Sequence, residues 1–358
     1  MKDEARMARS HRLGLLLGAL LLTGCSDDGM DALPLETAEV GVVLSSTELS
    51  LTIFEVEDPT QIRTVGLAPD GTPVSMAVRR GLAAVPLGIN PVVAVVDLQG
   101  GLLLRTIALP AGSGATGVAF LNDSIVLAAN PDLNSVTLVN VFAGTSGSEI
   151  AVDGYPQAVV VDGGRAFVLN AKLELDVELG FVVPGGPSTV SVIDIESLTV
   201  TKTIELSGEN AGAGRVGTDG RLYIVNSGSF GSANGSLSVV DLAGLTEVAH
   251  HPGFGDFPGS LALGPDARAF VGAFSYGVAV WDTSLDSFIR SPADALEPGG
   301  VPSISGVGFD DAGRLYTLTY DCVNPSTANR HDSAFAVDVT ISVGICPFAI
   351  AFTTIEGS

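Results

Sequence analysis

Short hydrophobic runs separated by Gly, Pro, Asp and Asn cover the chain from about residue 40 to its end. The clearest unit lies at Ser188–Ser207, where STVSVIDI is followed by a short turn and then by a second strand-like segment. Val, Ile, Leu and Thr dominate these runs, and no helical periodicity competes with them after residue 24. The pattern therefore predicts an all-β protein built from many short strands and tight turns.

One strand pattern, typified by TVSVIDI, recurs along the chain. Each copy is an apolar segment that ends close to an acidic or amide residue, and successive copies lie 42, 43, 54, 47, 41 and 56 residues apart. A four-stranded blade of a β-propeller has this length, so the repeat predicts a ring of antiparallel blades, one for each copy. The copies are Ser50–Val56, Pro91–Leu98, Ser135–Val141, Thr189–Ile195, Ser236–Leu242, Gly277–Thr283 and Ser333–Val339, with the acidic or amide residue at Glu55, Asp97, Asn140, Asp194, Asp241, Asp282 and Asp338.

Each interval also holds a second pair of short strands joined by a polar turn, and Pro156–Asn170 is a clear example. Asp162-Gly163 marks its hairpin because the turn needs a positive φ, which glycine adopts at little cost. With the strands of a blade named a to d, the chain starts with a b strand at Val40–Ser45 and ends with an a strand at Pro347–Phe352. We therefore expect the last strand to complete the blade of residues 40–67 and to close the ring without an open sheet edge.

Three predicted b strands end in an asparagine: LAAN (Leu127–Asn130), FVLN (Phe167–Asn170) and YIVN (Tyr223–Asn226). These segments resemble the signature of the YVTN-type β-propeller repeat, and SVTLVN, STVSVID and SLSVVD follow them at the distance found in that family. The resemblance covers residues 40–358 and is strongest in blades four and five, whereas AVPL (Ala84–Leu87) and VGAF (Val271–Phe274) lack the asparagine. It implies a seven-bladed β-propeller of four-stranded antiparallel blades.

The first 24 residues carry a targeting signal. Basic residues precede the apolar run Leu13–Leu22, which is too short to span a bilayer. Leu22–Cys25 resembles the bacterial lipobox, and this resemblance implies cleavage before Cys25 and attachment of a diacylglycerol to its sulfur. Two or three acyl chains would anchor the protein stably in a membrane of the bacterial cell envelope. An ordinary secretory signal or an uncleaved anchor is the alternative.

The residues after the cysteine indicate a sorting route and a tether. Ser26, rather than an aspartate, follows Cys25, which by analogy with enterobacterial sorting favours the outer membrane. Residues 26–39 are acidic, contain Gly and Pro and lack periodicity, so we expect them to be flexible. The expected organisation is a signal peptide at 1–24, a lipidated cysteine with its tether at 25–39, and one propeller at 40–358.

The chain is strongly acidic, with a formal net charge of -23. Residues 1–24 carry four basic and two acidic groups, so their removal lowers the net charge to about -25. Such a charge argues against nucleic acid as a partner and against broad contact with anionic lipid. Solubility outside the cytoplasm is a sufficient explanation of the charge.

Two cysteines remain after the lipobox. Cys322 follows a predicted b strand and Cys346 precedes the last a strand, and the alternating strand directions place both on one face of the ring. An exported protein can form disulfides, so we expect a bond between them that fastens the closing strand to its neighbour. Two free buried thiols are the alternative.

The same face receives every b–c and d–a loop, so we expect any ligand site to lie on it. The longest of these loops, Ala171–Pro187, contains Glu174, Asp176 and Glu178. Carboxylate oxygens suit calcium, which makes a calcium site conceivable. The alternation of these acids with apolar residues more simply indicates a hairpin whose acids face water.

Three histidines belong to the mature chain. His250 and His251 fall in a predicted d–a loop, and His331 falls in a predicted b–c loop. All three would then lie on the loop-covered face, which is the one indication of a transition-metal or acid–base site. Solvated loop histidines without a function are the alternative.

No motif indicates a catalytic residue. Gly112–Gly117 and Gly212–Gly217 match G-x-G-x-x-G, but each runs into a strand, whereas dinucleotide binding needs a helix at that position. We therefore expect a monomeric, lipid-anchored binding or scaffold protein that needs no cofactor and presents its loops to a protein or glycan partner. A propeller-type hydrolase such as a lactonase, or a subunit of an envelope redox system, is the alternative.

Overall fold

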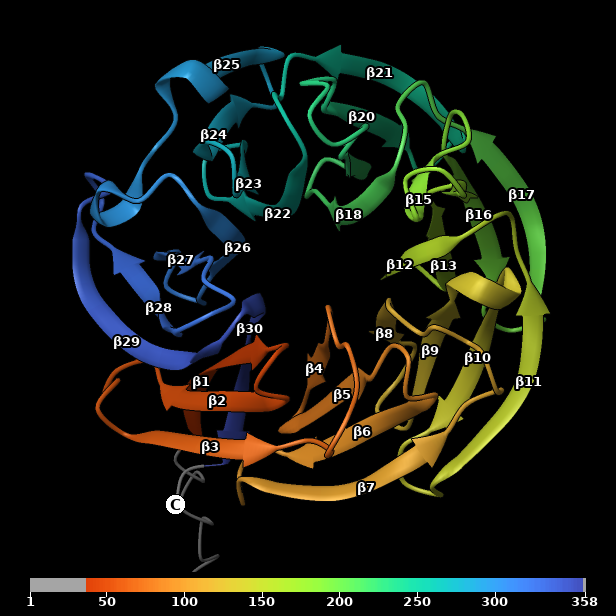
Figure 1. The fold of residues 1–358 in the computed structure, drawn as a ribbon, viewed down its shortest axis with the longest axis horizontal. Helices are drawn as coiled ribbons and strands as arrows, with labels where there is room; N and C mark the ends of the chain where they lie inside the picture. Colours follow the sequence, from red (N-terminus) through yellow and green to blue (C-terminus); the bar gives the residue numbers. More distant parts are fainter. Residues whose placement is uncertain (1–36, 357–358) are drawn as a thin grey trace, which may run out of the picture. The chain divides into compact units, whose positions relative to one another are not determined.

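The computed structural model describes residues 37–356, which form a ring of seven four-stranded antiparallel sheets (Figure 1). This arrangement confirms the predicted seven-bladed β-propeller. The predicted signal peptide at residues 1–24, Cys25 and most of the predicted tether lie outside the described residues. The helical turns of residues 37–356 are short 3-10 turns, and none is long and apolar enough to cross a bilayer.

The strands of each blade are given from the innermost strand a to the outermost strand d. Blade one contains β30 (Pro347–Glu356), β1 (Thr37–Ser45), β2 (Ser50–Glu55) and β3 (Ile62–Gly66). Blades two and three contain β4 (Ala77–Arg79), β5 (Leu82–Pro86), β6 (Val92–Asp97) and β7 (Leu102–Ala108), then β8 (Val118–Phe120), β9 (Ile125–Asn130), β10 (Ser135–Asn140) and β11 (Thr145–Ala151). Blades four and five contain β12 (Pro156–Asp162), β13 (Arg165–Asn170), β16 (Thr189–Asp194) and β17 (Thr199–Glu205), then β18 (Ala211–Val216), β19 (Arg221–Asn226), β20 (Ser236–Asp241) and β21 (Thr246–Pro252). Blades six and seven contain β22 (Pro258–Gly264), β23 (Arg268–Ala273), β24 (Gly277–Asp282) and β25 (Ser287–Arg290), then β26 (Ile304–Phe309), β27 (Leu315–Thr319), β28 (Pro325–His331) and β29 (Val337–Ile345).

The two ends of the described chain share blade one. β30 pairs antiparallel with β1 along its length, from Thr37 opposite Glu356 to Ser45 opposite Pro347 (Figure 1). The predicted closure of the ring is therefore confirmed. Both strands are longer than expected, because β1 already begins at Thr37, in residues assigned to the tether, and β30 continues past Phe352.

The seventh copy of the repeat was placed wrongly. Ser333–Val339 spans the c–d turn and the start of β29, so Asp338 lies in the outer strand, where it forms an ion pair with Arg330. Asp332 instead accepts backbone N–H groups in the turn, as Asp194 does in blade four. The true c strand, β28, has the sequence PSTANRH and lacks the apolar alternation that marks the other copies.

The hydrophobic core consists of the interfaces between neighbouring blades. Val42 and Ile53 of blade one pack in one cluster with Val85 of blade two, while Phe54 packs in another cluster with Tyr316 of blade seven. Each blade therefore buries one face against the blade before it and one against the blade after it, so its burial depends on a closed ring.

The asparagines at the ends of three b strands have a structural role. Asn170 is fully buried, and its amide nitrogen lies 3.0 Å from the Thr189 hydroxyl and 2.9 Å from the Ser191 hydroxyl, to which it donates hydrogen bonds. Asn130 and Asn226 make equivalent pairs of bonds in blades three and five. The side chain thus joins strand b to strand c inside the blade, where an unpaired amide nitrogen would be costly.

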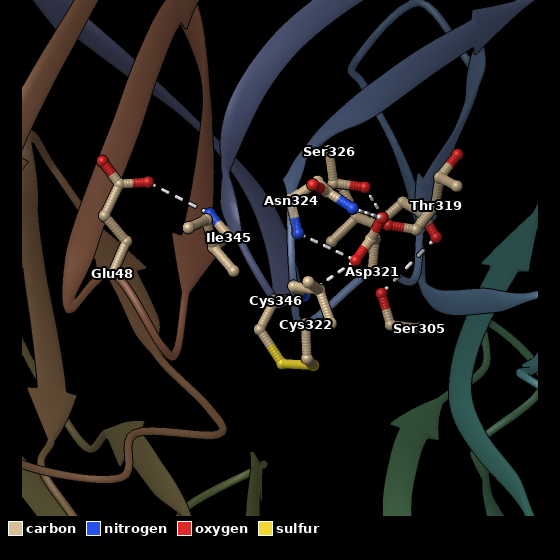
Figure 2. The surroundings of a disulfide bond; sticks show 11 residues. Glu48, Ser305, Thr319, Asp321, Cys322, Asn324, Ser326, Ile345 and Cys346 are labelled. Atoms are coloured by element: carbon tan, nitrogen blue, oxygen red, sulfur yellow. Dashed lines mark hydrogen bonds between the residues drawn. A yellow bond between two sulfur atoms is a disulfide. The ribbon is translucent and has the colours of Figure 1, made fainter.

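The predicted disulfide between Cys322 and Cys346 is present (Figure 2). The Cys346 N–H donates to the Asp321 carbonyl at 2.7 Å, and the Cys346 carbonyl accepts the N–H of Ser46, in blade one, at 2.8 Å. Figure 2 also shows Glu48 of blade one accepting the Ile345 N–H, at 3.0 Å. The residues that precede β30 are thus attached both to blade seven and to the other strands of blade one.

Candidate functional site

The connections between strands divide between the two faces of the ring. Strand direction alternates, so the b–c and d–a connections emerge on one face, which we call the loop-bearing face, and the a–b and c–d turns emerge on the other. The loop-bearing face carries the longest insertion, residues 171–188 between β13 and β16. It also carries the disulfide, as predicted.

The insertion in blade four forms a hairpin of its own. β14 (Leu173–Asp176) pairs antiparallel with β15 (Phe181–Pro184), which confirms the predicted hairpin extension. Glu174 and Glu178 are exposed, while Asp176 accepts the backbone N–H groups of Glu178 and Leu179 at 2.9 and 3.0 Å. The structure thus assigns the carboxylate of Asp176 to the turn.

A cavity of about 830 Å³ occupies the centre of the ring. The innermost strands of six blades contribute to its wall, as do Val74, Ser75 and Met76, which precede the innermost strand of blade two. The hairpin β14–β15 contributes apolar side chains at the loop-bearing end. Residues of the hairpin that line the cavity are Leu173, Leu179, Phe181, Val182, Val183 and Pro184. The cavity therefore combines a wall of repeated strands with one covering hairpin that is present in blade four alone among the described blades.

Hydrogen bonds between successive blades from blade three to blade six line part of the mouth of this cavity. Thr116 of blade three donates to the Gln157 carbonyl of blade four at 3.2 Å, and the Gln157 amide donates to the Asn210 side-chain oxygen of blade five at 3.4 Å. Ser227 of blade five donates to the Pro258 carbonyl of blade six at 2.7 Å. These polar groups are already engaged with one another, so they hold the shape of the mouth.

The three histidines do not come together. His250 and His251 lie in the outer strand β21 and not in a loop, and the His251 ring lies 4.7 Å from the Trp281 ring of the next blade. His331 ends β28, next to a c–d turn, and is 2% exposed. The predicted common position on the loop-bearing face is therefore wrong. His250 and His251 belong to β21 because this strand extends to Pro252, and His331 lies at the opposite end of blade seven because strand c is Pro325–His331 and not Ser333–Val339.

The six candidate ligand residues form no single site. Within residues 37–356 there is no group of three or more His, Cys, Asp or Glu side chains arranged to hold a metal ion. The three acids lie in the hairpin, two histidines lie on the rim, and His331 lies inside blade seven.

The environment of His331 makes the free energy of unfolding of the protein depend on pH. Its Nε2 lies 3.0 Å from the Thr317 hydroxyl and its Nδ1 lies 3.2 Å from the Phe335 carbonyl, partners that suit a neutral ring with the proton on Nδ1. Burial lowers the pKa of His331 below its ordinary value of 6.5, against the opposing effect of Asp332 and Asp338. The unfolded chain then binds more protons than the folded chain below this pH.

We expect the free energy of unfolding to fall as the pH drops below 6.5 through the protonation of His331. The variant His331→Asn should show a smaller difference in unfolding free energy between pH 7 and pH 5, measured by urea denaturation. His250→Asn, a half-buried histidine in another blade, is the control and should retain the difference. An unchanged difference in His331→Asn would assign the pH dependence to other groups.

Exposed apolar side chains occupy the tips of the b–c loops in five blades. Val177, in the hairpin of blade four, is 84% exposed. The equivalent loops of blades two, three, five and seven carry Ile89, Leu133, Phe230 and Val323. These tips lie on the same face as the mouth of the cavity.

The loops of this face are also acidic. Lys172 is the one basic residue among them, and it lies 3.6 Å from Asp153. The acidic residues of the same loops are Glu48, Asp70, Asp132, Asp153, Glu174, Asp176, Glu178, Glu209, Asp256, Asp294, Glu297 and Asp321. A face with apolar loop tips among acidic residues is complementary to a surface that is both apolar and basic.

The sequence reasoning missed Arg215, which is the one charged residue among residues 37–356 that lines the cavity. It lies in β18, and its side chain is exposed because it projects into the open centre of the ring. An alignment of the seven a strands would have revealed a basic residue in a segment that is otherwise apolar.

Fold and site together define the class of protein: a seven-bladed β-propeller with a central cavity and one loop-bearing face. No family model matches the chain, and no curated protein matches it. Among solved structures, a chain of hydrazine synthase from Kuenenia stuttgartiensis is similar, with a TM-score of 0.62 and 14% sequence identity over 82% of this chain and 97% of that chain. At this identity the similarity shows the fold alone.

Proposed function

We propose that this protein is a binding protein of the bacterial cell envelope, anchored through a lipidated Cys25, that uses its loop-bearing face to hold a partner. The observation that supports this proposal is the set of exposed apolar loop tips on an acidic face around one cavity mouth. A protein partner with basic and apolar side chains fits this surface better than a neutral glycan, which offers few apolar groups.

Anchoring through Cys25 would determine which face of the propeller lies nearer the membrane. β1 is a b strand, so the chain enters the propeller at Thr37 on the face opposite the b–c loops. A membrane attachment twelve residues before Thr37 would hold that opposite face nearer the membrane. The loop-bearing face would then point toward partners in the periplasm or outside the cell.

The proposal is tested by recovery of partners from envelope extract on the acylated protein. Wild-type protein should retain a protein partner at low salt and release it as ionic strength rises, because salt screens the acidic face. A variant that combines Val177→Ser and Phe230→Ser should lose this partner. Cys25→Ser should move the propeller from the membrane fraction to the soluble fraction.

The matched control is Leu285→Ser, which removes an apolar side chain that is 73% exposed on a c–d turn of the opposite face. This variant should retain the partner. A partner that is lost in Leu285→Ser and kept in the loop-tip variant would contradict the assignment of the loop-bearing face. Recovery of a neutral glycan instead of a protein would contradict the proposed partner chemistry.

A further inference from the structure

We propose that the central cavity binds an organic carboxylate with an apolar body, and that Arg215 is the residue that holds its carboxylate. This inference is independent of the proposed partner on the loop-bearing face. It rests on the position of Arg215 in the ring, its lack of an acidic neighbour and the chemistry of the surrounding wall.

Arg215 departs from the repeat at one level of the ring. Each a strand is aligned with its b strand through their pairing, and each b strand with the c-strand residue two positions before the acidic or amide residue that ends strand c. In blade seven that acidic residue is Asp332 and not Asp338. At the level of Arg215 every other blade has a small or apolar residue. These residues are Ala351, Ala77, Ala119, Val160, Ala262 and Gly308. The packing of the ring therefore does not require a cation at this level.

The guanidinium of Arg215 has no acidic partner. No carboxylate of residues 37–356 lies within 4.0 Å of it, and its one hydrogen bond runs from Nη1 to the carbonyl of the adjacent Gly214 at 2.8 Å. Arg314, by contrast, is paired with Asp310 and Glu57. The surrounding blades lower the pKa of Arg215 by desolvation. A partly desolvated cation without a counter-charge favours the binding of an anion.

The wall of the cavity selects an amphipathic molecule over an inorganic anion. Between Arg215 and the mouth, the a strands contribute partly buried apolar side chains, among them Ala158, Ala213, Phe348 and Ala349. Asn210, at the mouth, lies five residues before Arg215, which is about 17 Å along an extended strand. A ligand with its charged group at Arg215 would therefore place an apolar body along the channel.

The hairpin of blade four completes the apolar wall at the mouth. Phe181 and Leu179 line the cavity and are still largely exposed, so an apolar body that reaches the mouth would cover them. The guanidinium offers two parallel N–H donors, a geometry that matches a planar carboxylate. A volume of about 830 Å³ lies in the range of pockets that bury small organic molecules.

The test is isothermal titration calorimetry of the purified protein with decanoate. Decanoate should bind to the wild type, and Arg215→Gln should weaken its binding at least tenfold, whereas Arg215→Lys should retain part of it. 1-Decanol should bind the wild type more weakly than decanoate does. Its affinity for Arg215→Gln should equal its affinity for the wild type. Decyl sulfate and decyl phosphate, titrated in parallel, distinguish carboxylate from other anions.

The control is Arg221→Gln, which removes an exposed arginine of the same blade that faces Asp219 outside the cavity. Its affinity for decanoate should equal that of the wild type, and circular dichroism should show that all variants are folded. The inference is overturned if decanoate fails to bind, if Arg215→Gln binds it as well as the wild type does, or if sulfate or phosphate head groups bind more tightly. None of these results bears on the loop tips, so failure here is distinguishable from failure of the proposed partner site.

Discussion

Deletion of residues 347–358 is expected to abolish the cooperative unfolding of the propeller. The deletion removes β30, exposes the whole inner edge of β1, and takes Ile350 out of a cluster shared with Phe54 and Tyr316. Since every blade interface of a closed ring depends on the next, the loss of one strand opens the core on both sides of blade one. Differential scanning calorimetry should show a sharp transition for the wild type and none for the truncated chain.

Two point variants separate the loss of closure from a general failure to fold. Ile350→Asp places a charge in the buried part of β30 and should lower the melting temperature strongly. Thr354→Asp changes an exposed residue of the same strand and should leave the melting temperature close to that of the wild type. A truncated protein with unchanged melting would contradict the closure through β30.

Loss of the Cys322–Cys346 bond is expected to destabilise the protein by about 3 kcal/mol, the chain-entropy value for a loop of 24 residues. The double variant Cys322→Ser/Cys346→Ser should melt at a lower temperature than the wild type. The bond joins a loop of blade seven to the residue that precedes β30, so its removal should also weaken the attachment of the closing strand (Figure 2).

The effect of a thiol reductant on the melting temperature is the control for this prediction. A thiol reductant should lower the melting temperature of the wild type and should have no effect on the double variant. Alkylation of the folded wild type without prior reduction should label neither Cys322 nor Cys346. Labelling of both residues would mean that the bond does not form in the protein.

The fold was accessible from the sequence because it depends on local patterns. The segment at Ser188–Ser207 proved to be strands c and d of blade four, and Asp194 proved to be a turn residue that binds the N–H of Ser197. The prediction failed where the pattern itself was weak. β28 contains PSTANRH, so its apolar alternation is missing, and Ser333–Val339, which spans the c–d turn and the start of β29, matches the pattern of strand c more closely.

The candidate site could be predicted from the sequence less fully than the fold. The acids of the insertion were correctly assigned to a hairpin, but the contribution of Phe181 and Leu179 to the cavity was not foreseen. A hairpin signal determines the pairing of its own strands and contains no information about the surface over which it folds. His250 and His251 were misplaced because strand limits are the least certain part of a sequence-based assignment, and His331 was misplaced because β28 does not carry the pattern of a c strand.

The sequence by itself determined the blade number, the strand that closes the ring and the cysteine pair. Spacing and alternation encode these features locally, and antiparallel order then places the ends of strands on known faces. Only the tertiary structure decided that the hairpin lines the mouth of a central cavity and that Arg215 projects into it. Both sides of an innermost strand face other parts of the ring, so an alternating pattern cannot distinguish a residue between blades from one in the channel. Whether such a residue lies between blades or in the channel is determined only when all seven blades are assembled around a common centre.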